Sequence, residues 1–203
     1  MTGLPAPHDI IAFWIGETAS RPEALKAQNK IWFSGGPELD KTLKERFLTL
    51  LEILSAGPLA ADWAARGPRG RLAAILVLDQ FSRNIFRGNP RAFAQDQLAL
   101  HLCKEGLTAR EDLTLSEPER VFFYLPLEHS EDAGDQVRAV ELMAALHCDA
   151  RPGYEDYTLT ILDYAKRHQD VIRQFGRFPH RNAVVGRVST PEELDWLAEG
   201  GGF

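Results

Sequence analysis

The chain has 203 residues, of which 44% are apolar and 26% are charged. This composition is typical of a folded globular protein and excludes a disordered one. The formal net charge of -6 repels nucleic acids and anionic membranes, so neither is an expected partner. No apolar run approaches the ~20 residues that a membrane-spanning helix needs.

The cysteines and the first residues bear on the expected location. Cys103 and Cys148 form no Cys-x-x-Cys pair, so we expect no disulfide framework and no zinc site. Residues 1–8 carry no Lys or Arg, and the apolar stretch 10–15 is too short for a signal-peptide core. The sequence also lacks a phosphate-binding loop and a dinucleotide fingerprint. We therefore expect a cytoplasmic protein without a metal or cofactor.

Apolar residues recur with helical spacing through most of the chain, and no stretch alternates convincingly as a strand does. About nine helices are predicted, including a long one at 154–175. Short connections between them favour antiparallel neighbours, so the expected fold is all-α, a single domain over 1–203 built from stacked helical hairpins. The predicted helices run over residues 9–15, 20–33, 37–54, 72–81, 91–104, 116–125, 130–146, 154–175 and 190–196, and residues 59–63 are expected to form at most a short helix.

Several helix ends have a chemical reason. Ser116 and Glu119, and likewise Thr190 and Glu193, have the spacing of a capping box, in which the acidic side chain reaches back to the start of its helix. Gly106 is expected to end one helix, Gly176 another, and Pro126 is expected to stop the helix that begins after Ser116.

Two similar segments stand 98 residues apart. Arg83-Asn84 and Arg181-Asn182 each follow a phenylalanine and are each followed, four residues after the asparagine, by a glycine. Both are expected to be loops that offer a guanidinium and an amide to one shared polar site. The second segment also carries Arg177 and His180.

Asp79 lies on the same helical face as the apolar residues Leu72, Ile75 and Leu76, so its carboxylate needs a partner. Arg83, four residues further on, is the expected one. Asp79 then either fastens the helix end to its loop or orients Arg83 toward a ligand.

Charge is segregated in the second half of the chain. An acidic block from Glu128 to Glu141 includes Asp132, and residues 166–187 hold six basic residues and one acid. The blocks form either solvated faces and an internal salt network or the two sides of one cleft. His168 falls on an apolar stripe, which favours a core position, whereas His129 and His180 are expected near loops and are better candidates for proton transfer.

Three blocks of sequence resemble a bacterial family catalogued as domain of unknown function 924: residues 79–88, residues 123–132 and residues 175–182, with Phe13-Trp14-Ile15-Gly16 similar to the usual opening of the family. The likeness covers almost the whole chain, although Ser82 stands where proline is common. The resemblance implies an all-helical, tetratricopeptide-like arrangement. It brings no established activity and no catalytic residues.

Three functions remain open from the sequence, and the oligomeric state is not predicted. The first is a helical-hairpin binding module for a small anionic ligand or a peptide carboxylate. The second is a hydrolase or lyase in which His129, Glu128 or Asp132 acts as general acid or base. The third is a purely structural polar network. The predicted ligand-binding residues of the first are Asp79, Arg83, Asn84, Arg177, His180, Arg181 and Asn182.

Overall fold

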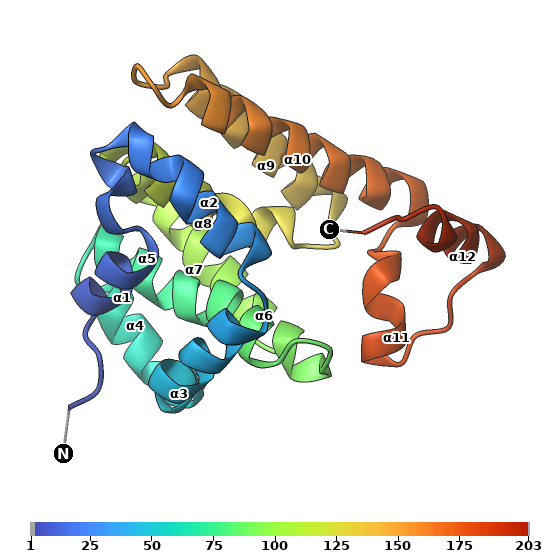
Figure 1. The fold of residues 1–203 in the computed structure, drawn as a ribbon, viewed down its shortest axis with the longest axis horizontal. Helices are drawn as coiled ribbons and strands as arrows, with labels where there is room; N and C mark the ends of the chain where they lie inside the picture. The colour runs from blue at the N-terminus through green and yellow to red at the C-terminus, as the bar shows by residue number, and fades with distance from the viewer. Residues whose placement is uncertain (1–2, 203) are drawn as a thin grey trace.

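A computed structural model describes residues 3–202, and within this range the fold is all-α, with no strand. Short helical turns connect the main helices, and the one-turn helices α6 and α11 go beyond those that the pattern predicts (Figure 1). The helices are α1 (Pro7–Trp14), α2 (Leu25–Ser34), α3 (Gly36–Ser55), α4 (Pro58–Ala64), α5 (Pro68–Ile75), α6 (Ser82–Ile85), α7 (Asp96–Thr108), α8 (Glu117–Glu128), α9 (Ala133–Cys148), α10 (Glu155–Phe175), α11 (Asn182–Val185) and α12 (Pro191–Ala198).

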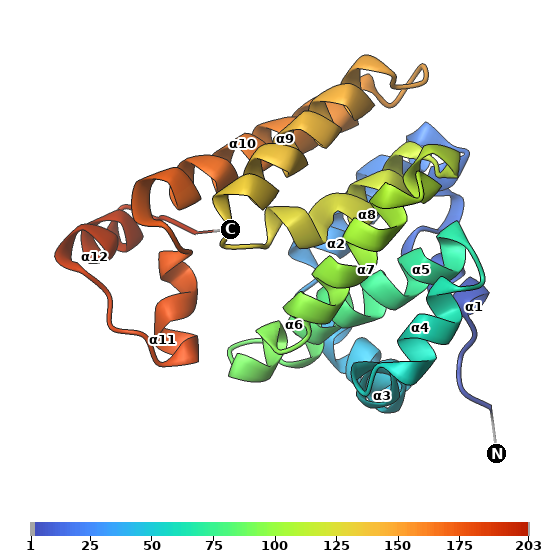
Figure 2. The ribbon, with the colours of Figure 1, turned by 180° about the vertical axis from the view of Figure 1, so that it is seen from behind.

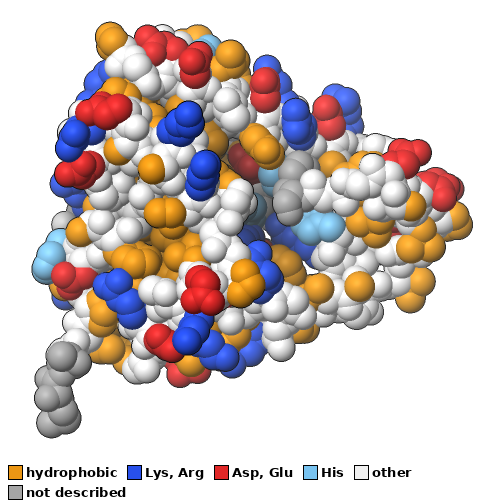
Figure 3. Space-filling view, in the orientation of Figure 1, with side chains coloured by type: hydrophobic (Ala, Val, Ile, Leu, Met, Phe, Trp, Pro, Cys, Tyr) orange, Lys and Arg blue, Asp and Glu red, His pale blue; other side chains and the backbone are white. Residues whose placement is uncertain are grey.

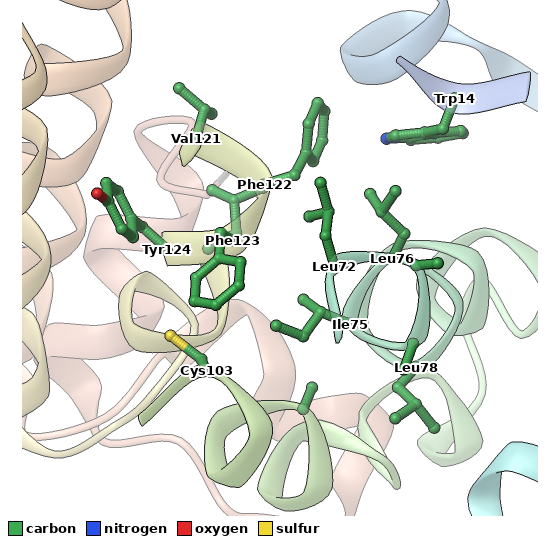
Figure 4. Close-up of a cluster of buried hydrophobic side chains, with 14 of the residues drawn as sticks. Trp14, Leu72, Ile75, Leu76, Leu78, Cys103, Val121, Phe122, Phe123 and Tyr124 are labelled. Carbon is green, nitrogen blue, oxygen red and sulfur yellow. The ribbon is translucent and has the colours of Figure 1, made fainter. Parts of the chain in front are cut away.

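The main hydrophobic core lies around α5 and the segment that continues it. Every residue from Leu72 to Asp79 is fully buried, and the side chains of α5 and α8 meet there below Trp14 (Figure 4). The Trp14 ring packs edge-on against Phe81 at 5.2 Å and Phe122 at 5.9 Å between ring centroids. Such aromatic pairs add to the gain from burying their area, so this cluster fixes α1 and α8 against the centre of the body.

Helices α9 and α10 extend from the body as a layer packed on α8 (Figure 1). Helices α8, α9 and α10 pack in sequence, and α9 and α10 lie side by side in both ribbon views (Figures 1 and 2). The predicted long helix is confirmed as α10, and Gly176 ends it with φ 68°. This neighbour packing agrees with the expected hairpins, while a regular tetratricopeptide-like superhelix stays a prediction.

Beyond α10 the chain turns back toward the body as a C-terminal arm, residues 176–202. The arm has a small apolar cluster of its own, in which Phe178 packs with Val171 and Ile172 of α10 and with Trp196 of α12. The arm therefore rests on the end of α10, while polar contacts described below join it to the body.

Two of the predicted helix starts have the expected chemistry. The Glu119 carboxylate accepts a hydrogen bond from the Ser116 amide at 2.8 Å, and the Glu193 carboxylate accepts one from the Thr190 amide at 2.8 Å. Both acidic side chains are almost completely buried. Capping thus satisfies the first amides of α8 and α12 as predicted.

The predicted end of α8 at Leu125 is wrong, because the helix continues through Pro126 to Glu128, and the His129 amide still donates to the Leu125 carbonyl at 2.8 Å. Proline inside a helix costs about 3 kcal/mol. The fully buried Phe122 and Phe123 of the same helix offset this cost by packing into the core. The extra turn carries Glu128 and brings His129 to the helix end.

The predicted end at Gly106 is also wrong, because this glycine lies inside α7. A methyl group at its position would lie 2.5 Å from Arg71 Cδ and 2.5 Å from Phe123 Cζ. Glycine is therefore needed for the close approach of α7 to α5 and α8.

Gly106→Ala is accordingly expected to lower the free energy of unfolding by about 1–3 kcal/mol through overpacking. Urea unfolding measures the effect, with Thr108→Ala at the exposed end of the same helix as the control. Equal midpoints for the two variants would contradict the close-packing argument.

Both Arg-Asn segments are helical, so the two loops expected there are wrong: Arg181 ends the short helical turn Pro179–Arg181, and Asn182 begins α11. Residues Leu76–Phe81 form a π-helical segment, with a wider turn than an α-helix, between α5 and α6. Arg83 and Asn84 then lie within α6, and Asp79 lies in the widened turn.

Within residues 3–202 no single helix combines the length and apolar character needed to span a membrane, although the sharply bent pair α3 and α4 meets the criterion when taken together.

Candidate functional site

A cleft of about 220 Å³ lies between the body and the C-terminal arm. Figure 3 shows the surface hollowed between these parts, with basic and histidine side chains gathered there. One wall comes from α7 and the turn before it, the floor from the α8–α9 connection, and the other wall from the arm. The lining residues are Phe93, Asp96, Gln97, Leu100, Pro126, His129, Ser130, Glu131, Arg181, Val185 and Arg187.

His129 is held in place by Asp79. Its Nδ1 lies 2.8 Å from Asp79 Oδ1, and its side chain is 14% exposed, whereas Asp79 is fully buried. Burial by itself would raise the pKa of Asp79, but the charge of Arg83 and the hydrogen bond from His129 hold that pKa well below its usual value. An ionised carboxylate only accepts hydrogen bonds, so Nδ1 carries the proton and Nε2 is the acceptor nitrogen.

The two Arg-Asn segments meet at Asp96. Arg83 donates two hydrogen bonds to the Asp96 carboxylate, at 2.7 and 3.1 Å, and also pairs with Asp79 at 3.4 Å. Arg181, from the arm, reaches the same carboxylate at 3.5 Å. Asp96 thus bridges guanidinium groups that are 98 positions apart in the sequence, and Asp79 links this group to His129.

Arg181 is the buried cation of the cleft. Its guanidinium contacts the rings of Phe178, at 4.4 Å, and Phe93, at 4.9 Å, and the residue is only 8% exposed. Its buried Nε has no hydrogen-bond partner among the described residues. Burial, and next the charge of Arg83, lower the pKa of Arg181 to about 10, which shows a cation that its surroundings compensate only in part.

Glu131 joins the arm to the body. Its carboxylate accepts hydrogen bonds from Arg187 at 2.7 and 2.9 Å and from the Phe178 amide at 2.8 Å. Burial alone would raise the pKa of Glu131, yet the hydrogen bond from Arg187 lowers it. One acid of the predicted acidic block therefore does pair with one base of the predicted basic block.

Glu128 lies outside the cleft lining and is 3% exposed. One oxygen, Oε1, is 3.1 Å from His168 Nδ1, and Oε2 has no hydrogen-bond partner within the described part of the chain. Burial, followed by the charge of Asp79, raises the pKa of Glu128 to about 8, and burial lowers the pKa of His168 to about 3. Burial therefore favours the neutral form of both groups. The expected core position of His168 agrees with its burial.

The other predicted site residues have partners away from the cleft lining. Asn84 donates to the Gln80 carbonyl at 2.9 Å, and Asp132 caps α9 by accepting from the Asp135 amide at 2.9 Å. His180 lies against the Phe178 ring at 5.6 Å, and burial, followed by the charge of Arg181, lowers the pKa of His180 to about 4. None of these three side chains reaches the cleft.

Arg177 and Asn182 organise the arm. Both donate to the buried Glu193 carboxylate, Arg177 at 2.6 and 2.8 Å and Asn182 at 3.0 Å. The hydrogen bond from Arg177 lowers the pKa of Glu193 to about 2. These contacts join the start of the arm to α12. Of the three arginines predicted for the site, Arg181 is the one among the described residues that lines the cleft.

Sequence reasoning did not single out Phe93, Asp96 or Arg187 as site residues. Asp96 lies in the first turn of α7, a common position for an acid because the helix dipole stabilises its negative charge. Phe93 lies in the short helical turn before α7. Arg187 was one of six bases in a block. Of these three residues, only Arg187 was indicated by a sequence pattern, namely the segregation of basic residues in 166–187.

No group of three or more His, Cys, Asp or Glu side chains within residues 3–202 is placed to hold a metal ion.

Comparison with known proteins defines the family but no activity. A family model described as "Bacterial protein of unknown function (DUF924)" matches residues 10–201. The solved structure of a protein of unknown function from Agrobacterium tumefaciens is similar, with 36% sequence identity, a TM-score of 0.79, and coverage of 96% of this chain and 97% of that one. No curated protein matches. The chain therefore belongs to the bacterial family of domain of unknown function 924, as its sequence motifs indicate.

Proposed function

We propose that the chain is a cytoplasmic protein that binds a small anionic molecule in the cleft between the body and the C-terminal arm, with the Arg181 guanidinium as the principal contact. The observation that carries this proposal is the incomplete compensation of Arg181. Its carboxylate neighbour, Asp96, already accepts two shorter hydrogen bonds from Arg83. A buried guanidinium that shares its carboxylate partner with a second arginine favours an anion that supplies a further counter-charge.

The rings on either side of Arg181 support this role. The Arg181 guanidinium lies over the rings of Phe93 and Phe178, which hold the planar group by cation–π contacts. An edge-on guanidinium donates two parallel hydrogen bonds to a carboxylate or phosphate, which lysine cannot do. Arg187 lines the same cleft, and its buried Nε also lacks a partner among the described residues.

The size of the cleft favours a small ligand over a peptide. Its volume of about 220 Å³ is below the ~300–1,000 Å³ of pockets for drug-sized molecules. Apolar groups of Phe93, Leu100 and Val185 line part of it. We therefore propose a metabolite with one carboxylate or phosphate and a short carbon body.

Calorimetric titration with succinate and with inorganic phosphate tests the proposal. Arg181→Gln is expected to weaken binding of these probes roughly 10- to 100-fold, because a hydrogen bond to a charged group contributes about 1.5–3 kcal/mol. Arg181→Lys should lose most of the affinity as well. Arg173→Gln, which changes an exposed arginine of α10, is the matched control.

Raised salt should weaken binding to the parent protein. Equal affinity in the parent and Arg181→Gln, or no binding of either anion by the parent protein, would contradict the proposal. In that case a structural network is the better explanation, and Arg181→Gln should affect only the free energy of unfolding.

A further inference from the structure

The Asp79–His129 pair has a geometry that anion binding alone does not require. A buried carboxylate fixes the ring of His129 through Nδ1, and the ring itself lines the cleft. Nε2 makes no hydrogen bond to any residue in 3–202. A carboxylate behind an imidazole fixes its tautomer and stabilises the imidazolium that forms when the other nitrogen takes a proton.

We infer that His129 is the general base in the hydrolysis of a small ester that carries an anionic group, with Asp79 as its positioning residue. This inference rests on the anion site proposed above, because Arg181 holds the anionic group of the substrate. The sequence predicted His129, Glu128 or Asp132 as general acid or base. We select His129, with Asp79 as the orienting carboxylate, because Glu128 is buried outside the cleft lining and Asp132 caps α9.

The charges of the cleft favour proton uptake by His129 when an anion is bound. Around a neutral imidazole they balance, with three guanidinium groups and three carboxylates: Arg83, Arg181, Arg187, Asp79, Asp96 and Glu131. A bound anion adds one negative charge. An imidazolium at His129 restores the balance, so a proton-transfer step that creates this cation is favoured within the occupied cleft.

Water is the group on which the base acts. Ser130 is the hydroxyl residue of the cleft lining, but its Oγ donates to Asp135 at 2.8 Å and accepts from the Asp132 amide at 3.2 Å. It is thus occupied by the start of α9 and does not face His129 as a nucleophile. Because the described lining of the cleft offers no activated side-chain nucleophile, the base assists direct attack by water.

The reaction then balances as follows. His129 Nε2 takes a proton from water while the water oxygen bonds to the ester carbonyl carbon, and the carbonyl oxygen becomes an oxyanion. The positive charge of Arg187, which also lines the cleft, stabilises this oxyanion. The carbon–oxygen bond to the alcohol then breaks, and the leaving alkoxide takes the proton from the imidazolium. The products are a carboxylic acid and an alcohol, and His129 returns to its neutral form.

Hydrolysis of p-nitrophenyl hemisuccinate, with neutral p-nitrophenyl pentanoate for comparison, tests this inference. The parent protein should hydrolyse the hemisuccinate with saturation. His129→Asn, which keeps an N–H for Asp79, should lower kcat by about 100-fold or more. Arg181→Gln should raise KM for the hemisuccinate by a larger factor than it changes hydrolysis of the neutral pentanoate. His101→Asn, at an exposed histidine of α7, is the matched control.

Two further measurements separate a positioning role of Asp79 from a structural one. The ¹⁵N chemical shifts of the His129 ring should show the Nδ1–H tautomer in the parent, and Asp79→Asn should change the tautomer and lower kcat. The kcat/KM of the parent should follow the neutral imidazole of the ligand-free protein. Its inflection should lie below pH 6.5, because burial and the charge of Arg83 lower the pKa of His129, although the charge and the hydrogen bond of Asp79 raise it.

The outcomes distinguish the two proposals. Retained succinate binding with no hydrolysis above the rate in solution, or with equal rates in the parent and His129→Asn, would overturn the catalytic inference and leave the binding site standing. An Nε2–H tautomer in the parent would overturn it as well. Loss of both binding and hydrolysis in the parent would overturn the anion site itself.

Discussion

Glu128→Gln is expected to become progressively more stable than the parent protein as the pH rises from 4.5 to about 8. The ordinary pKa of this carboxyl, 4.5, applies to the unfolded chain, and burial raises the pKa to about 8 in the folded protein. A group with a raised pKa contributes stability that is fully present below its unfolded value and is lost as the pH rises through its folded value. Glutamine cannot ionise, so the variant avoids this loss.

The expected difference is several kcal/mol over this interval, because one pKa unit corresponds to about 1.4 kcal/mol. Urea unfolding at several pH values measures it as the difference between variant and parent. That difference cancels the opposite contribution of His168 and His180, whose lowered pKa values make the protein less stable as the pH falls below 6.5. Glu141→Gln, at an exposed carboxylate of α9, should show no such trend, and a flat curve for Glu128→Gln would refute the assignment of a neutral Glu128.

Asp79→Ala is expected to cost about 3 kcal/mol or more of unfolding free energy at pH 7. The fully buried carboxylate accepts hydrogen bonds from His129 and from Gln80, the latter at 2.6 Å, and pairs with Arg83. Its removal leaves these buried donors without their acceptor, and breaking a buried ion pair from one side typically costs about 3–5 kcal/mol. Asp79→Asn keeps an acceptor oxygen and should cost less.

The midpoint of urea unfolding reports both changes. A suitable control is Asp40→Asn, which removes the partner of the exposed Arg87 and should cost less than about 1 kcal/mol, as surface pairs do. If Asp79→Ala unfolded within that same margin of the parent, the network around Arg83 and His129 would not be a stabilising element of the body.

The sequence correctly predicted those helix starts that depend only on residues close together in the chain. The acidic residues at positions 119 and 193 cap their helices because a reach of three residues is set by helix geometry alone. Pro126 shows where such rules stop. Its local preference is to end α8, but the energy of burying the aromatic face of that helix depends on α5 and α1, which the local pattern does not contain.

The candidate site was only partly predictable for the same reason. The pairing of Asp79 with Arg83 follows from helical spacing and is present at 3.4 Å. The contact of Asp79 with His129 joins residues 50 positions apart, and the meeting of Arg83 and Arg181 depends on Asp96, which has no unusual sequence context. Arg177 and Arg181 look equivalent in the sequence. They are four residues apart, yet Arg177 pairs with Glu193 inside the arm, whereas Arg181 lines the cleft.

The π-helical segment Leu76–Phe81 also determines which way the side chains of α6 face. A π-turn holds one residue more than an α-turn, and each residue of an α-helix turns the next by about 100°. The extra residue therefore changes the directions of the side chains in and after this segment. Asp79, within it, faces His129, and Arg83, after it, faces Asp96. Shortening this turn by a single codon would keep the composition of the core almost intact and rotate Arg83 away from its partner. The spacing of the chain here, as much as the identity of its residues, is what assembles the cleft.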